Sequence, residues 1–453
     1  MPEDNPRDGL AWSEASFWDI PIWTREPQLS AVETVCRRVL AIDPKDSCTV
    51  TSFDSGTWNK LYLVESPAGR VLMRVSLPAD PKQKVLGEAT TLRWIRDATD
   101  VPVPDVIAFD DSQDNEITFE WILMELMPGI PASKAWRKMS MSDKKSFVEQ
   151  VAQFQAQLFQ QSSEVGQFRS IGTLYPDQHS PEPATATPKP GHFVDNSFFS
   201  KDHFSCQIPR GPYRSCHEWF DAYLEMIIQA QTEKMRIAQE EEDEDDLDEA
   251  EACRALAQKL KTAIPIFFPP PLHGGESAEQ TVLVHNDLAL HNILVDRDSA
   301  KVTAILDWEC VSAKPLWLAT KVPEFLRGEE DRDEEPQRSI YADASEDDEE
   351  EDNGLDNEGK NGLYWIHLME YEQTQLRPVY TAKMKELWPQ WGKAASSHRE
   401  LDFYEALGWC ESGWKIQRVA NWADAVMNHT EGEEFPQLED YLSAPRVQPK
   451  ISI

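Results

Sequence analysis

The stretch His285-Asn286-Asp287-Leu288-Ala289-Leu290-His291-Asn292 decides the fold of this chain. It has the pattern H-x-D-x-x-x-x-N, and Asp307-Trp308-Glu309 begins fifteen residues after its last Asn. Short apolar runs flank both motifs, so buried strands are expected to deliver these polar residues to the edge of a cleft. An Asp that accepts a hydroxyl proton, together with an Asn and a second Asp that hold Mg²⁺, is the minimal set for phosphoryl transfer from ATP.

Three polar residues of these motifs have chemistry that fits such a site. Asp287 follows an apolar run, and a carboxylate in the loop after a strand can accept the proton of a substrate hydroxyl. Taken alone, it could equally be a turn or cap residue. Asn292 offers an amide oxygen that can bind a hard cation without adding charge. Asp307 ends another apolar run, where an acid is costly to desolvate unless it meets a cation or several donors, and Mg²⁺ suits such sparse coordination.

A buried charge pair is predicted from helical spacing. Between residues 81 and 98, apolar residues recur three and four positions apart, which specifies a helix. Glu88 falls within this apolar stripe rather than opposite it. A buried glutamate requires a cationic partner, and Arg74, which has apolar neighbours, is the natural candidate. The alternative is that Glu88 lies at the edge of the stripe and reaches solvent.

The order of expected elements divides the chain into two unequal lobes. Residues 1–45 are expected to form a helical N-terminal extension. Residues 46–127 contain short β-type runs, one helix and an extended stretch that ends at Pro128-Gly129, and they predict a small β-rich lobe. Residues 128–453 are mainly helical and contain the catalytic motifs. The predicted fold class is therefore α+β, with a small β-rich N-lobe and a large helical C-lobe.

The formal net charge of −36 is unevenly distributed. Residues 240–251 carry ten acids and no base, and residues 329–358 carry sixteen acids and two arginines. We interpret both runs as parts of solvated, disordered insertions, near 238–252 and 328–361. An acidic chain also lacks the basic surface that nucleic-acid backbones require, so we expect no nucleic-acid partner.

The pattern of cysteines and of apolar residues predicts the cellular compartment of the protein. Seven scattered cysteines without C-x-x-C spacing argue against a disulfide framework or a zinc site and fit a reducing compartment. The N-terminal stretch has no charged-then-apolar signal, and no window of about eighteen apolar residues could span a membrane. We therefore expect a cytoplasmic monomer without a membrane partner.

The chain resembles the aminoglycoside-phosphotransferase-like (phosphotransferase enzyme) family of the protein-kinase-like fold, particularly its large fungal branch. The resemblance covers most of residues 48–430 outside the acidic runs, and its most specific part is HNDLALHNILV…AILDWE. Weaker support comes from GTWNKLYLV, VLMRVSL and WILMELMPG. The resemblance implies a bilobal protein-kinase-like fold and the ATP- and Mg²⁺-dependent phosphorylation of a hydroxyl on a small-molecule substrate.

Carried over by position, the resemblance also implies residue roles. Asp287 would be the catalytic base, and Asn292 and Asp307 would be the Mg²⁺ ligands. Arg74 would face the phosphates, with Glu88 as its partner on the helix. The remaining nucleotide-binding residues would lie in the turn above the phosphates and in the hinge that binds the adenine edge: Ser55, Gly56, Met124, Glu125 and Met127.

Two departures from the family pattern leave an alternative open. Arg74 stands where the family usually has Lys, and the larger guanidinium positions phosphate oxygens differently. Asn286 replaces the Gly of the common H-G-D, and Asn tolerates a positive φ better than most other non-glycine residues. The alternative is a pseudoenzyme that keeps the fold for nucleotide binding or regulation. The segment after Glu309 has no A-P-E motif, which disfavours a protein kinase.

The remaining polar residues of the motif leave the substrate undetermined. We interpret His285 as a residue that holds the loop by hydrogen bonding, whereas His291 either approaches the substrate or caps the turn. A cationic amino sugar or choline-like alcohol would suit an acidic cleft, but the visible acidity lies mostly in the two acidic runs.

Overall fold

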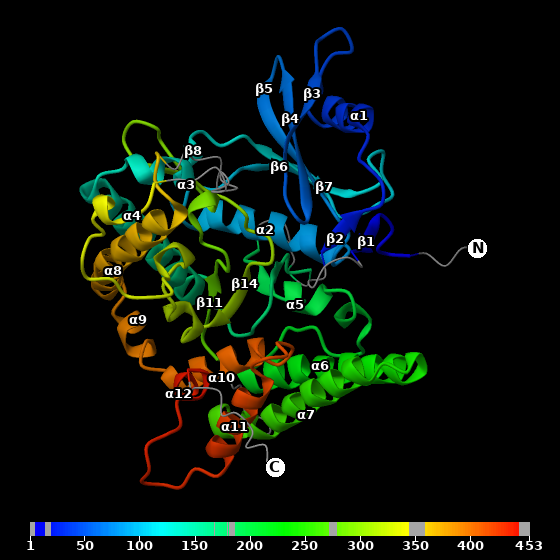
Figure 1. The fold of residues 1–453 in the computed structure, drawn as a ribbon. Coiled ribbons are helices and arrows are strands. Elements are labelled where there is room, and N and C mark those ends of the chain that lie inside the picture. Colours follow the sequence, from blue (N-terminus) through cyan, green and yellow to red (C-terminus); the bar gives the residue numbers. More distant parts are fainter. Residues whose placement is uncertain are drawn as a thin grey trace.

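A five-stranded antiparallel sheet forms the smaller lobe of the molecule (Figure 1). The computed structural model describes residues 5–13, 20–166, 168–178, 180, 186–270, 279–343 and 358–443. The strands of the sheet, in spatial order, are β3 (Thr49–Ser55), β4 (Asn59–Ser66), β5 (Gly69–Ser76), β7 (Glu120–Glu125) and β6 (Val106–Asp110). This sheet confirms the β-rich N-lobe.

The helix predicted over residues 81–98 is present as α2 (Gln83–Ala98). It contacts β6 and β7 and continues the small lobe toward the centre of the molecule (Figure 1). The side chain of Glu88 lies buried on its packed face, as the apolar stripe predicted.

The N-terminal extension is only partly helical, so the prediction for residues 1–45 needs correction. Its elements are the paired strands β1 (Leu10–Trp12) and β2 (Pro21–Trp23) and the helix α1 (Leu29–Val39). The ring of Trp23 lies 5.0 Å from that of Phe119, which precedes β7. Such a contact between distant parts of the chain stabilises a strand pair that helical spacing cannot reveal.

The larger lobe is mainly helical, which confirms the α+β class with two unequal lobes. Its long helices are α4 (Met141–Glu164), α6 (Cys216–Glu241), α7 (Glu244–Phe267) and α8 (Gly362–Leu387). Its shorter helices are α3 (Ala132–Ala135), α5 (Asn196–Phe199), α9 (Pro389–Ala394), α10 (His398–Gly408), α11 (Ile416–Met427) and α12 (Leu438–Leu442). In the part of the chain that the structure describes, no helix is long and apolar enough to cross a membrane.

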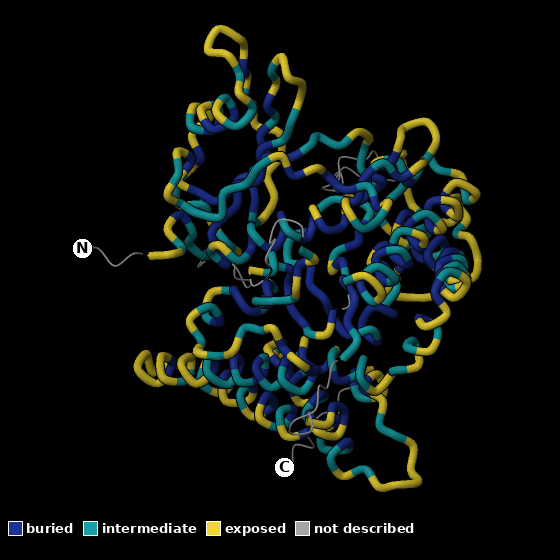
Figure 2. Tube along the Cα trace, turned by 180° about the vertical axis from the view of Figure 1, so that it is seen from behind, coloured by how far each residue is buried: buried dark blue, intermediate teal, exposed yellow. Residues whose placement is uncertain are grey.

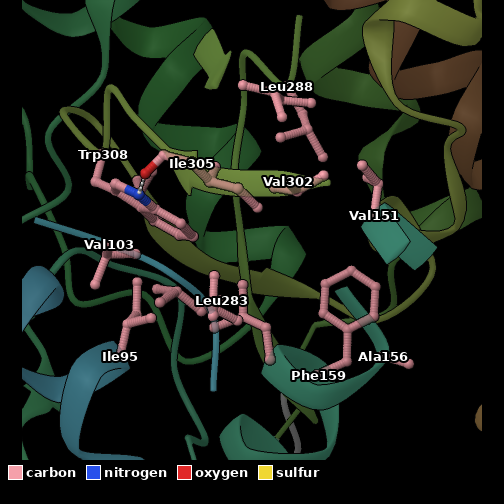
Figure 3. Packing of buried hydrophobic residues seen from close by; sticks show 14 of the residues in the cluster. Ile95, Val103, Val151, Ala156, Phe159, Leu283, Leu288, Val302, Ile305 and Trp308 are labelled. Carbon is pink, nitrogen blue, oxygen red and sulfur yellow. Dashed lines mark hydrogen bonds between the residues drawn. The ribbon is translucent and has the colours of Figure 1, made fainter. Parts of the chain in front are cut away.

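Short strands carry the catalytic motifs at the junction of the lobes. They are β8 (Ile130–Pro131), β11 (Thr281–Val284), β12 (Ile293–Val295), β13 (Val302–Ile305) and β14 (Ser312–Pro315). Strand β11 pairs with β14, and β12 pairs with both β13 and β8. One apolar core continues beneath them, where Ile95 of α2 and Phe159 of α4 lie in the same cluster as Leu283 of β11 (Figure 3). The motif H-x-D-x-x-x-x-N is thus a loop held between two buried strands.

The acidic run at residues 240–251 is helical, so the prediction of a disordered insertion near 238–252 was wrong. Helix α6 ends within this run and α7 begins in it (Figure 1). Asp243 caps α7 by accepting a hydrogen bond of 3.0 Å from the N–H of Asp246, and acids in a first helical turn meet the positive end of the helix dipole. Ala238 and Ala250 are buried, whereas most charged side chains around them are exposed (Figure 2).

The second acidic insertion, predicted near residues 328–361, is only partly described. Residues 344–357 lie outside the described residues. Its first part is held against α8, because the Arg332 guanidinium contacts the Glu370 carboxylate at 2.9 Å and the N–H of Arg332 donates to Thr374 Oγ1 at 2.9 Å. This part therefore departs from the predicted disorder.

A buried ion pair joins α4 to α8 and generates a test of the fold. The Lys144 ammonium contacts the Glu372 carboxylate, whose other oxygen accepts a 2.7 Å hydrogen bond from Trp136 Nε1. We predict that Lys144→Ala lowers the free energy of unfolding by about 3 kcal/mol, because it leaves Glu372 buried and unpaired. Urea denaturation measures the change. The matched control Lys145→Ala removes an exposed neighbour and should cost less than about 1 kcal/mol; equal losses would contradict the prediction.

Candidate active site

A cleft of about 1100 Å³ lies between the two lobes. Its lining includes residues from the sheet of the small lobe, from the chain segment that joins the lobes and from the catalytic loop. The sequence-predicted site residues all line this one cleft: Ser55, Gly56, Arg74, Glu88, Met124, Glu125, Met127, Asp287, Asn292 and Asp307. The fold thus brings together residues that are far apart along the chain.

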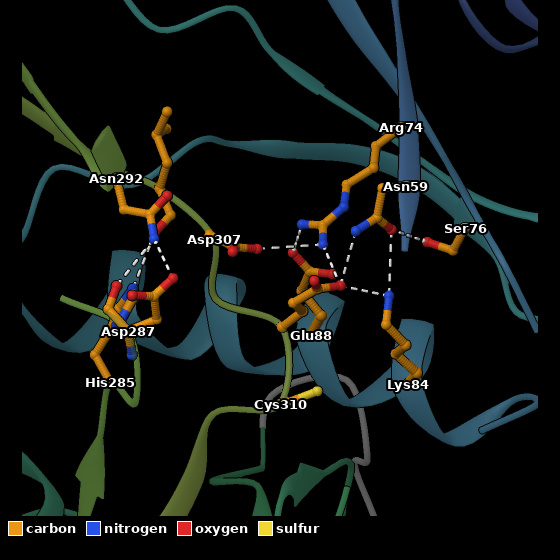
Figure 4. A network of polar contacts seen from close by, with 12 residues as sticks. Asn59, Arg74, Ser76, Lys84, Glu88, His285, Asp287, Asn292, Asp307 and Cys310 are labelled. Carbon is orange, nitrogen blue, oxygen red and sulfur yellow. Dashed lines mark hydrogen bonds and ion pairs between the residues drawn. The ribbon is translucent and has the colours of Figure 1, made fainter. Parts of the chain in front are cut away.

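Asn292 and Asp287 are joined by hydrogen bonds within the catalytic loop (Figure 4). Asn292 Nδ2 donates to the carbonyl oxygen of Asp287 at 2.9 Å and to its carboxylate Oδ2 at 2.8 Å. The amide nitrogen is therefore committed to Asp287, and the amide oxygen of Asn292 is the atom available to a cation. The side chain of Asp287 is 43% exposed, so the candidate base remains accessible from the cleft.

The two histidines of the motif occupy different positions. His285 Nε2 contacts the carbonyl oxygen of Leu306 at 2.9 Å, and its Nδ1 accepts from the N–H of Asp287 at 3.3 Å. Burial lowers the pKa of His285, which favours the neutral ring that this pair of bonds requires. These contacts agree with a residue that holds the loop. His291 is 64% exposed, and its Nε2 lies 3.6 Å from Asp287 Oδ2, beside the candidate base.

Asp307 lies in a tight turn directly after β13. Its φ of 61° is in the left-handed region, and the indole of the following Trp308 donates to the carbonyl oxygen of Ile305 at 2.8 Å, which pins the turn. Burial raises the pKa of Asp307, and the nearby Glu309 raises it further, against the opposing effect of Arg74. A carboxylate in such surroundings gains from a bound cation.

A buried charge cluster connects the turn after β13 to the small lobe (Figure 4). Arg74 on β5 contacts both Glu88 and Glu309, and Lys84 on α2 contacts Glu309 as well. The predicted pairing of Glu88 with Arg74 is therefore present. The side chain of Glu88 is only 1% exposed, which rules out a position at the edge of the stripe.

Two members of this buried charge cluster and one neighbour were not predicted as site residues. The D-W-E motif contains Glu309 without predicting a role for it, and Lys84 and Asn59 lie outside the catalytic motifs. Asn59 Nδ2 donates to Glu309 Oε2 at 2.9 Å, and its Oδ1 accepts from Lys84 Nζ at 3.2 Å. Lys84 lies one helical turn before Glu88 on the same face of α2, and this spacing was the signal that could have identified it.

The two carboxylates of the cluster have opposite pKa shifts. Burial raises the pKa of Glu88 to about 7, although Arg74 opposes the rise. Burial would also raise the pKa of Glu309, but Lys84 and Arg74 together outweigh it and hold that pKa at about 2. Glu309 is therefore the member whose negative charge is most strongly stabilised by the fold.

The two residues that depart from the family pattern, Arg74 and Asn286, both make specific polar contacts. Arg74 is at the expected position, but its guanidinium contacts three carboxylates, with Asp307 at 3.4 Å as the third. Asn286 does not adopt the positive φ for which we considered it suited. Instead its amide bridges two groups, because Nδ2 donates to the carbonyl oxygen of Cys310 at 2.8 Å and Oδ1 accepts from Lys314 Nζ at 2.8 Å. A glycine could make neither bond.

The predicted nucleotide-binding turn and hinge form the small-lobe side of the cleft. Ser55 ends β3, and the N–H of Gly56 donates to the carbonyl oxygen of Asn59 at 2.9 Å, which closes the turn before β4. The carboxylate of Glu125 accepts from Arg96 and from the N–H of Asp105, both at 3.3 Å. The side chain of Glu125 is thus engaged locally, and its backbone N–H donates to the carbonyl oxygen of Asp105 at 2.9 Å.

Gly129 passes very close to the catalytic strands where the chain leaves the hinge. Its φ is 119°, a conformation that disfavours side chains. A Cβ atom here would lie 2.4 Å from Thr303 Oγ1 and 2.8 Å from the carbonyl oxygen of Val295. The hinge therefore rests directly on β12 and β13.

The sequence match over the region that builds this cleft identifies the family. A model described as the phosphotransferase enzyme family matches residues 49–318. The chain belongs to the phosphotransferase enzyme family. Membership confirms the resemblance drawn from HNDLALHNILV…AILDWE, and it assigns the chain to the phosphotransferases. The matched region contains every residue of the buried charge cluster and every predicted site residue.

Two fungal proteins are related to the chain at low sequence identity. Two Aspergillus fumigatus proteins, each described as a subtelomeric hrmA-associated cluster protein, are 24% identical over 322 residues. That match covers 62% of this chain and 61% of each relative, so it spans less than two thirds of their length. Their source agrees with the fungal branch of the family.

Two solved structures cover most of the chain at low identity. An aminoglycoside-3'-phosphotransferase of type VIII is 17% identical, with a TM-score of 0.39 and coverage of 84% of this chain and 98% of the other. The streptomycin-ATP-APH(2")-IIa ternary complex is 10% identical, with a TM-score of 0.38 and coverage of 92% and 99%. Family membership rests on the sequence match over residues 49–318.

The depressed pKa of Glu309 gives a pH-dependent test of the buried charge cluster. Because the folded-state pKa of about 2 lies below the ordinary carboxylate value, Glu309 stabilises the fold above that ordinary value and loses its contribution as the pH falls toward 2. We predict that Glu309→Gln lowers the free energy of unfolding by about 3 kcal/mol near neutral pH and by less near about pH 3.5, measured by urea denaturation.

A surface ion pair supplies the control for this experiment. Glu33 and Arg37 lie one turn apart on α1 and are both partly exposed, so Glu33→Gln should cost less than about 1 kcal/mol. A cost for Glu309→Gln that equals this value, or that stays constant as the pH falls, would contradict the assigned charge state.

Proposed function

We propose that this phosphotransferase moves the γ-phosphoryl group of ATP, in the presence of Mg²⁺, to a hydroxyl of a small molecule. The observation that carries the proposal is the convergence of Asp287, Asn292 and Asp307 on the cleft that also contains the predicted nucleotide turn and hinge. The proposed step forms a bond from the acceptor oxygen to the γ-phosphorus and breaks the bond from that phosphorus to the bridging oxygen of ADP. The hydroxyl proton passes to Asp287.

Asp287 is suited to accept this proton. Asn292 holds its Oδ2 by the 2.8 Å hydrogen bond, so the carboxylate is oriented and its Oδ1 can face an acceptor. His285 positions the same loop through the N–H of Asp287. The base is therefore held by neighbours on both sides while it remains accessible.

Asn292 and Asp307 are the residues that would hold Mg²⁺. Within the described ranges, no group of three or more His, Cys, Asp and Glu side chains gathers as a metal site. Mg²⁺ fits a sparser set, because it keeps water and phosphate oxygens as ligands beside one or two protein groups. The half-buried carboxylate of Asp307 and the amide oxygen of Asn292 match that requirement. Bound Mg²⁺ would neutralise charge on the transferred phosphoryl group.

A nucleotide-binding pseudoenzyme remains the second candidate function, and one observation favours it. The guanidinium of Arg74 contacts Glu88, Asp307 and Glu309, so it is engaged by carboxylates rather than turned toward a phosphate. Binding and turnover therefore have to be measured separately.

Nucleotide binding is tested by thermal unfolding. We predict that Mg²⁺-ATP raises the Tm of the parent protein and that Asp307→Asn removes most of the rise, because the Asp307 carboxylate is a proposed ligand. Asp298→Asn alters an exposed aspartate outside the cleft and should leave the rise unchanged. Absence of any rise in the parent would exclude both candidate functions.

Turnover separates the enzyme from the pseudoenzyme. We predict slow release of ADP from Mg²⁺-ATP, with water as the acceptor, and a decrease of about 100-fold in Asp287→Asn because the proton acceptor is lost. The variant should keep the Tm rise with Mg²⁺-ATP. Turnover that survives Asp287→Asn would contradict the assigned base, and binding without turnover in the parent would favour the pseudoenzyme.

A further inference from the structure

The wall of the cleft next to the catalytic loop is basic. Lys314, Lys321 and Arg327 line it, together with Tyr404 of α10. The three cations come from β14 and from the chain that follows it, and the sequence motifs assigned none of them a role. Because an acceptor must approach Asp287 from within the cleft, the charge of this wall bears on the acceptor's chemistry.

Lys314 carries the positive charge to the catalytic loop itself. Its side chain is only 3% exposed, and its ammonium donates to Asn286 Oδ1 at 2.8 Å, one residue before the candidate base. Its nearest carboxylate oxygen belongs to Asp195 at 3.6 Å. Asp195 is also the cap of α5, where it accepts from the N–H of Ser197 at 3.1 Å. Lys314 is thus only partly neutralised.

Lys321 and Arg327 have no carboxylate partner in the described part of the chain. The Lys321 ammonium lies 5.0 Å from the centre of the Tyr404 ring and forms no side-chain hydrogen bond with a described residue. Burial lowers the pKa of Lys321, and Arg327 and Lys314 lower it further, so Lys321 lies close enough to both cations to be repelled by them. Arg327 Nε donates to the carbonyl oxygen of Val322 at 3.2 Å, which leaves the outer guanidinium nitrogens for another acceptor.

Among the described residues, Asp195 is the only carboxylate that forms an ion pair with a cation of this wall, and it already caps α5. The other lining carboxylates on this side of the cleft, Glu324 and the candidate base Asp287, form no ion pair with the three cations. Glu405 opposes the pKa shift of Lys321, but it is exposed and does not line the cleft. Lys314 is buried, Lys321 is half-buried and Arg327 is exposed, so the mutual repulsion acts mainly on the two lysines, and a bound anion would relieve it.

We propose that the acceptor is an anionic hydroxyl compound whose carboxylate or phosphate binds Lys321 and Arg327 while its hydroxyl faces Asp287. The planar guanidinium of Arg327 suits either group, since both present paired oxygens to its donors. This inference rests on the proposed function. It disfavours cationic amino sugars, which give the family its name, as acceptors for this protein.

Anion binding to the nucleotide-free protein tests the proposal directly. Thermal unfolding at constant ionic strength, with chloride as the balancing ion, compares citrate, inorganic phosphate and glucosamine as probes. We expect a saturable rise in Tm with citrate or phosphate and none with glucosamine. The anion that binds with the higher affinity, citrate or phosphate, indicates whether a carboxylate or a phosphate is the group recognised.

Variants of the basic wall assign the binding to these residues. Lys321→Ala and Arg327→Ala should each lower the affinity for the anion by about tenfold. Lys321→Arg, which keeps the positive charge, should retain most of the parent's affinity. Lys385→Ala removes an exposed lysine of α8 outside the cleft and serves as the matched control. No saturable rise with either anion, an unchanged affinity in both alanine variants, or a larger rise with glucosamine would each overturn the proposal.

Mg²⁺-ATP distinguishes failure of this inference from failure of the proposed function. Lys321→Ala should keep the Tm rise that Mg²⁺-ATP produces in the parent. If that rise is present and the anion result is negative, the acceptor proposal alone is wrong. If the parent shows no rise with Mg²⁺-ATP, the proposed function fails whatever the anions do.

Discussion

The two lobes are held in their relative position by the buried charge cluster. Arg74 lies on β5 and Lys84 on α2, and both contact Glu309 in the turn after β13, while Glu88 completes the pairing with Arg74. Charges buried this deeply are tolerated only when each meets a partner in good geometry. The small-lobe sheet, its helix and the catalytic turn must therefore keep one arrangement, and the cleft takes its shape from it.

Much of the candidate site could be predicted because its residues follow apolar runs that are short and unambiguous. Asp287, Asn292 and Asp307 each adjoin a buried strand, and Glu88 stood out as an acid on an apolar stripe. Lys84 was missed because a lysine at the start of a helix ordinarily reaches solvent, and its partner Glu309 lies far along the chain. Pairing between distant charges is a tertiary property that local spacing does not contain.

The errors in the fold have the same origin. The acidic run at residues 240–251 has a composition typical of disorder, yet a cap at Asp243 and buried alanines make it the junction of two packed helices. The many charged residues of this run lie on the solvated faces of the two helices. Amino-acid composition does not reveal the few alanines on the narrow face that packs. Likewise, a net charge of −36 says nothing of the wall formed by Lys314, Lys321 and Arg327, where the local sign is reversed.

Gly129 brings the hinge side of the cleft into close contact with the strands beside the catalytic loop. Because Gly129 has no side chain and Thr303 Oγ1 of β13 donates to the carbonyl oxygen of Pro128 at 2.6 Å, the chain leaving the small lobe lies directly on β12 and β13. The surface expected to meet the adenine and the surface that supports the proton acceptor are therefore two sides of one continuous wall. The separation of these two surfaces is fixed by close contacts of Gly129 and Pro128 with β12 and β13, so a larger residue at position 129 would push the hinge away from the catalytic strands.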